Sequence, residues 1–87
     1  MTAVETGRQF AKSFARGGVV AVSRDDDPAS AQFAGELMSG LKTAGFLIEY
    51  LAVVTRPARG RSIRSGGIAH LHIRAGSLAV LWVARPT

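Results

Sequence analysis

The chain has 87 residues, contains no cysteine and carries a formal net charge of +5. A chain this short forms one domain with a single core, which leaves little room for a deep substrate cleft. Without cysteine it has no disulfide framework, no thiolate metal site and no cysteine nucleophile. We therefore expect a single domain, residues 1–87, whose function lies on a surface or a loop.

The apolar segments are too short to cross a membrane. The longest uninterrupted apolar run is residues 78–84, against the roughly 20 residues that a membrane-spanning helix needs. The first residues include Glu5 and lack the basic patch, apolar stretch and cleavage site of a secretory signal. We expect a cytoplasmic protein without a membrane span.

The first predicted element is a helix over residues 3–16. Thr2 and Glu5 form a T-x-x-E capping box, in which each side chain accepts a hydrogen bond from the other residue's backbone N–H. Apolar residues then recur at near-helical spacing until two adjacent glycines end the pattern. Because short helices are marginal alone, this one should depend on packing Phe10 and Phe14 against a sheet.

A strand, a helix and a second strand follow. Residues 19–22 are apolar and mostly β-branched, which is typical of a buried strand. Asp27 and Pro28 supply an N-cap and a proline at the first helical position, so a helix is expected over 28–44. The apolar stretch 47–55 is the next strand. Short connections between these elements predict a right-handed crossover and a parallel strand pair.

The last part of the chain combines a loop with a hairpin. Residues 56–67 hold four arginines, three glycines and one proline, which predicts an exposed loop. Residues 68–74 alternate apolar and polar side chains, Gly76 and Ser77 indicate a two-residue turn, and 78–84 completes the hairpin. The whole pattern predicts an α+β fold in which two helices pack on a mixed four-stranded sheet, order α-β-α-β-β-β with a C-terminal hairpin.

That turn also predicts which side chains face the core. It pairs Leu71 with Trp82 on the core face and leaves His70 and His72 on a mixed, half-exposed face. The side chains predicted to share one core are Leu37, Leu41, Leu71, Ile73 and Trp82. If both helices cover one face, Leu81 and Val83 leave an apolar patch on the other, and such a patch favours a homodimer or a partner.

Charge is distributed unevenly along the chain. Up to residue 55, five basic residues nearly cancel six acidic ones, whereas the remainder holds six arginines and no acid. A coding bias toward arginine explains the scarcity of lysine but not the missing acids. Guanidinium groups bind carboxylates and phosphates in a bidentate manner, and a positive field speeds association with anionic partners.

We therefore expect a non-catalytic small binding protein that docks its arginine-rich loop and sheet face on an acidic protein or nucleoprotein partner. Accessory and inhibitory proteins of phages and mobile elements are one class of this kind. The predicted partner-binding residues are Arg56, Arg59, Arg61, Arg64, Arg74, His70 and His72. The first alternative is direct nucleic-acid binding, and the second is a small basic RNase-type toxin.

The histidine pair also allows a metal hypothesis. His70 and His72 lie on the same side of a strand, and Glu49 would complete a ligand set if strand order brought it beside them. Strand order does not follow from the sequence, and alternating histidines are more often the polar side of a half-buried strand. No nucleophile motif is present. We expect no catalytic residue, no metal and no cofactor.

Overall fold

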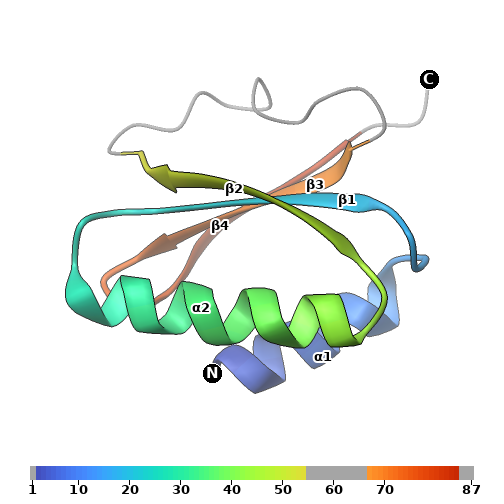
Figure 1. The fold of residues 1–87 in the computed structure, drawn as a ribbon, viewed down its shortest axis with the longest axis horizontal. Helices are drawn as coiled ribbons and strands as arrows, with labels where there is room; N and C mark the ends of the chain where they lie inside the picture. Colours follow the sequence, from blue (N-terminus) through green and yellow to red (C-terminus); the bar gives the residue numbers. More distant parts are fainter. Residues whose placement is uncertain (1, 55–66, 85–87) are drawn as a thin grey trace.

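In the computed structural model, the described residues are 2–54 and 67–84 (Figure 1). The elements are α1 (Ala3–Ser13), β1 (Val19–Arg24), α2 (Pro28–Thr43), β2 (Leu47–Val53), β3 (Gly67–Arg74) and β4 (Ser77–Val83). Both helices lie on one face of a four-stranded mixed sheet, and β3 and β4 form an antiparallel hairpin at the C-terminal end (Figure 1). The predicted fold class and element order are confirmed. Neither of the two helices in the described ranges is long and apolar enough to cross a membrane.

Helix α1 starts as predicted and ends earlier. The Thr2 hydroxyl accepts from the Glu5 backbone N–H at 3.1 Å, and the Glu5 carboxylate accepts from the Thr2 backbone N–H at 3.4 Å. The helix ends at Ser13 because Phe14 takes an extended conformation as the C-cap. This turns the Phe14 ring onto that of Phe10, with ring centroids 4.3 Å apart.

Helix α2 begins with the predicted N-cap and ends at a glycine. The Asp27 carboxylate accepts from the Ala29 backbone N–H at 2.8 Å. At the other end Gly45 adopts a left-handed φ of 98°, and the Phe46 N–H donates to the Leu41 carbonyl at 3.0 Å. This Schellman arrangement buries the Phe46 ring and directs the chain into β2.

The sheet has the order β2-β1-β3-β4, with β1 parallel to both of its neighbours. The predicted parallel pair is therefore present, and β2 and β4 are the edges. The core lies between the sheet and the helices. Its largest fully buried apolar side chains are Leu37, Leu41, Leu71, Ile73, Val20 and Val22.

The hairpin turn differs by one residue from the prediction. Its two residues are Ala75 and Gly76, with φ of 51° and 78°, and this backbone suits the twist of a hairpin. The turn is held from outside the hairpin: the Ala75 N–H donates to the Asp25 carboxylate and the Gly76 N–H to the Ser30 hydroxyl, each at 3.0 Å. Contacts with residues distant in sequence, rather than the glycine alone, position the turn.

The shifted turn and a bulge change the register of β4. Ala79 is an extra residue between the pairs formed by Leu78 and Val80, so Leu81 pairs with Leu71 and lies on the helix side. Trp82 instead pairs with His70 on the opposite side. The prediction of Trp82 in the core is wrong, as is the prediction that Leu81 and Val83 belong to the face without helices.

Candidate functional site

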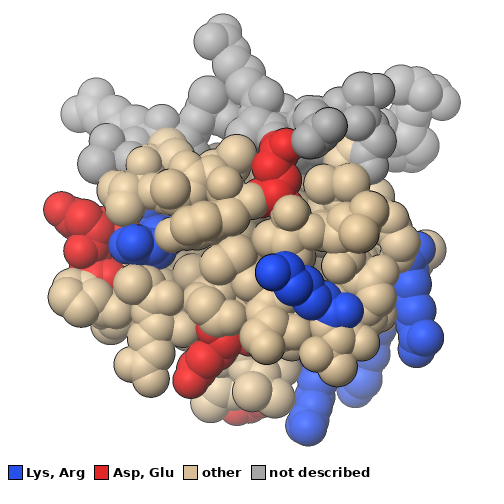
Figure 2. All heavy atoms as spheres, viewed as in Figure 1, with Lys and Arg blue, Asp and Glu red and all other residues tan. Residues whose placement is uncertain are grey.

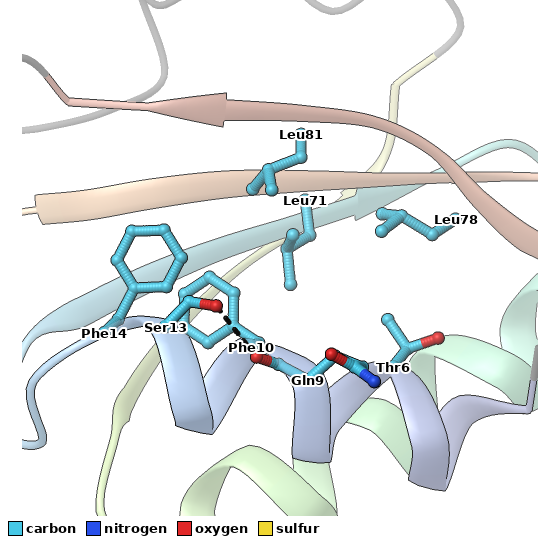
Figure 3. A pocket seen from close by; sticks show the side chains of 8 residues that line it. All are labelled: Thr6, Gln9, Phe10, Ser13, Phe14, Leu71, Leu78 and Leu81. Atoms are coloured by element: carbon cyan, nitrogen blue, oxygen red, sulfur yellow. Dashed lines mark hydrogen bonds between the residues drawn. The ribbon is translucent and has the colours of Figure 1, made fainter.

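A groove lies between α1 and the β3–β4 hairpin, on the helix side of the sheet (Figure 3). Its volume is about 170 Å³. Its lining residues are Thr6, Gln9, Phe10, Ser13, Phe14, Leu71, Leu78 and Leu81. The five from α1 and its C-cap have the spacing i, i+3, i+4, i+7, i+8, so they form one stripe that faces the sheet.

The groove exists because the helices cover β3 but not β4. Leu71 on β3 is 1% exposed, whereas its partner Leu81 on β4 is 43% exposed although it shares the same face. Val83, two residues further along β4, is 49% exposed. The outer strand therefore presents apolar side chains beside an apolar groove.

The chemistry of the groove suits an apolar side chain rather than catalysis. The Thr6 hydroxyl donates to the Thr2 carbonyl at 2.8 Å, and the Ser13 hydroxyl donates to the Gln9 carbonyl at 3.1 Å (Figure 3). Both hydroxyls are thus used within α1. None of the eight lining side chains is ionisable, so the groove offers no general acid, general base or charged ligand for an ion.

A second candidate is a polar cluster on the other side of the sheet. Ser23 on β1 pairs with His72 on β3, and His70 lies two residues away on the same face. The Ser23 Oγ is 2.6 Å from His70 Nε2 and 2.8 Å from His72 Nδ1. One hydroxyl therefore bridges two imidazoles, donating its proton to one ring and accepting from the other.

The three side chains of this cluster are fully buried. Ser23, His70 and His72 are each 0% exposed, so the predicted half-exposed histidine face is wrong. The His70 ring also contacts the Trp82 ring, with centroids 4.9 Å apart. Within the described part of the chain, the buried His72 Nε2 atom has no hydrogen-bond partner.

Burial also determines the charge of the cluster. It lowers the pKa of both histidines, because a buried imidazolium loses its hydration. The other imidazole lowers the pKa of His70 further, and Arg74 does the same for His72, while Asp25 opposes this shift. Both rings are therefore neutral at neutral pH.

The structure answers the open question about Glu49. Glu49 and His70 are both in register with Ala21, which lies between them on β1. Two strand spacings separate their backbones by about 10 Å, since neighbouring strands lie roughly 4.8 Å apart. Among residues 2–54 and 67–84 no three His, Cys, Asp or Glu side chains gather in a way that could hold a metal ion.

Some of the charged side chains in the described part lie at the ends of the helices. In Figure 2, basic side chains gather at the lower right, over the C-terminal ends of the helices, whose last turns hold Lys12 and Lys42. Three successive acids, residues 25–27, precede the N-terminal end of α2. The two lysines lie where the helix dipole favours positive charge, and Asp27 caps the N-terminal end of α2.

The predicted partner-binding residues are only partly described. Arg74 is exposed at the end of β3, where it pairs with Ser77. The structure brings His70 and His72 together. The arginines that lie outside the described residues are Arg56, Arg59, Arg61 and Arg64.

Sequence reasoning missed Ser23, although a signal was present. Ser23 follows Ala21 at a spacing of two on one face of a strand whose other face carries Val20 and Val22. A small polar residue on the less apolar face of a central strand indicates a hydrogen-bonding partner on the neighbouring strand.

No known protein family, curated protein or solved structure matched the chain.

Proposed function

We propose that this protein is a non-catalytic binding protein that docks on an acidic protein or nucleoprotein partner in the cytoplasm. One observation carries the proposal: the accessible groove and the ionisable cluster are separate. The groove is lined by no ionisable side chain. The cluster of Ser23, His70 and His72 contains two titratable rings, but its three side chains are fully buried. The Ser23 hydroxyl is hydrogen-bonded to both rings. Binding through a surface suits this separation better than turnover of a substrate.

The charge distribution supports an anionic partner. The described residues hold six basic and six acidic side chains, so the net charge of +5 comes from arginines outside them. Together with exposed Arg74, their guanidinium groups suit carboxylates of an acidic protein or phosphates of a nucleoprotein. An accessory or inhibitory role, as in small proteins of phages and mobile elements, fits a surface that binds without catalysis.

Two other functions are weaker proposals. Direct nucleic-acid binding uses the same arginines, and no specific observation favours it over an acidic protein. A small basic RNase would need a histidine within reach of a phosphate, and both His70 and His72 are buried.

The test compares two triple substitutions that each remove three positive charges. The first replaces Arg59, Arg61 and Arg64 with Ala, and the control replaces three exposed cations of the N-terminal part. These control positions are Arg8, Lys12 and Arg16. Affinity capture from the native host should recover an acidic partner with the wild type and the control variant, and lose it with the first variant.

Titration with labelled single- and double-stranded oligonucleotides separates the alternatives. Nucleic-acid binding weakens linearly in log affinity against log salt, with a slope of about −0.9 per phosphate neutralised on duplex DNA. Equal capture by both triple variants would contradict the proposal. Tight oligonucleotide binding with such a slope would replace it by the nucleic-acid alternative.

A further inference from the structure

Strand β4 is an edge strand of the sheet, and the bulge at Ala79 is the one irregularity in its pairing with β3. Its seven residues, Ser77–Val83, include no charged side chain and no proline. It lies beyond β3 at the end of the sheet, next to the apolar groove. Natural edge strands usually carry lysine, proline or a charge that faces inward, because an uncharged apolar edge invites another strand.

The backbone of β4 is oriented to accept such a strand. The Ala84 N–H donates to the Ile68 carbonyl at 3.0 Å, so these two residues form a hydrogen-bonded pair toward β3. Bonded and non-bonded pairs alternate along an antiparallel ladder. Trp82 therefore points its peptide groups toward β3, whereas Leu81 and Val83 point theirs to the outer edge.

The opposite edge of the sheet is blunted. Strand β2 carries Glu49, and its pairing with β1 shifts register between Val22 and Ser23. Ala52 there has a φ of 59°, which twists the edge out of a regular strand. Head-to-tail addition of β4 to β2 of another copy, which would produce open filaments, is disfavoured.

We propose that two copies of the chain pair through β4, antiparallel about a two-fold axis at Leu81, to form one continuous sheet. In this register Leu81 faces Leu81 of the second copy, Val83 faces Ala79, and Val80 faces Trp82. Every directly opposed pair is apolar, and the outward peptide groups of Leu81 gain hydrogen-bond partners from Leu81 of the second copy. The exposed Leu81 and Val83 side chains of both copies then lie side by side between the two α1 helices, which covers the open side of the groove.

A second copy fits this edge better than an unrelated protein because the chain supplies the complement itself. In an isologous contact the same surface of each copy meets the other, so a charged side chain on the two-fold axis would face a like charge. Ser77–Val83 has none, and the basic and acidic side chains of the described residues are equal in number. The inference is independent of the proposed binding of an anionic partner, which uses other residues and a separate measurement.

The test is the mass of the protein in solution with three lysine variants. Sedimentation equilibrium of the wild type should give twice the chain mass of 9.2 kDa, with a monomer appearing on dilution. Leu81→Lys and Val83→Lys should each give the monomer mass, because each places like charges at the pairing edge. Leu47→Lys is the control: it makes the same change at a side chain that is 61% exposed on the other edge strand, and should remain dimeric.

Amide hydrogen exchange tests the register in the unaltered chain. The N–H group of Leu81 should be protected at high concentration and should lose this protection on dilution, whereas that of Trp82 stays protected throughout. This measurement decides the matter if both lysine variants fail to fold. The proposal would be overturned by a wild type that is monomeric at every concentration, or by a dimer that neither lysine variant weakens. Exchange at the Leu81 N–H that does not depend on concentration would also overturn it.

Discussion

The two faces of β3 are both buried, but different interactions hold them. On the helix side, Leu71 and Ile73 belong to the apolar core that the sheet forms with α1 and α2. On the other side, His70 and His72 share the hydroxyl of Ser23. The first face is stabilised by removing apolar surface from water, which is insensitive to pH. The second depends on hydrogen bonds between neutral rings, so a proton or the loss of one hydroxyl can disturb it.

The largest effect is expected on the apolar face. Leu41 is fully buried in the core, so Leu41→Ala should lower the free energy of unfolding by about 2 to 5 kcal/mol, through lost burial and the cavity left behind. Urea denaturation measures it. The control is Leu47→Ala at a 61% exposed position, expected to change stability by no more than about 0.5 kcal/mol. Equal effects at both positions would show that the assigned core is wrong.

A smaller but substantial loss is expected on the histidine face. Ser23→Ala removes the only hydroxyl between His70 Nε2 and His72 Nδ1, leaving buried nitrogen atoms without that partner. Such a loss costs about 1 to 3 kcal/mol. Ser39→Ala on the exposed side of α2 is the control and should be nearly neutral. If Ser23→Ala were equally silent, the bridge would contribute nothing to stability.

The comparison of the two faces also shows what the sequence could predict. The helix ends were predictable because their signals are local: Asp27 caps α2, and Gly45 ends it, using atoms a few residues away. The alternation of Leu71 and Ile73 likewise identified the core face of β3. These elements, with short connections between them, were sufficient for the fold class.

The histidine face was not predictable, because contacts distant in sequence determine it. The turn that sets the register of β4 is held by Asp25 and Ser30, which lie far from it in the chain. A prediction from the hairpin alone placed the turn one residue late and did not include the bulge at Ala79, which moves Trp82 to the opposite face. The burial of His70, and its hydrogen bond to Ser23, depend on strand order.

The histidine face should also make stability depend on pH. Unfolded histidines have a pKa of about 6.5, and burial lowers the pKa of both His70 and His72 in the folded state. Above pH 6.5 both states hold neutral rings and this part of the stability is fully present. As pH falls through 6.5 toward the lowered folded values, the unfolded chain binds more protons, so the free energy of unfolding decreases.

Urea denaturation between about pH 7.5 and 5.5 covers this window and stays above the range in which most carboxylates titrate. NMR titration of the two imidazoles in the folded protein gives their pKa values directly, and both should lie below that of a free histidine. Stability that rises on acidification in this window would show that the rings gain a favourable charged partner on folding, contrary to the arrangement described.

The smallest effect concerns the turn that joins β3 to β4. Ala75 has a φ of 51° in that turn, a conformation that costs a residue with a Cβ roughly 1 kcal/mol and costs glycine little. Ala75→Gly should therefore raise the free energy of unfolding by a few tenths to about 1 kcal/mol, while the backbone N–H that donates to Asp25 is retained. Ala31→Gly makes the same change at an exposed position inside α2 and should instead lower stability by about 1 kcal/mol.

Opposite signs for the same substitution, measured in one urea series, would establish the left-handed turn at residues 75–76. A loss of stability at both positions would mean that the turn lies elsewhere, and with it the pairing of Trp82 with His70.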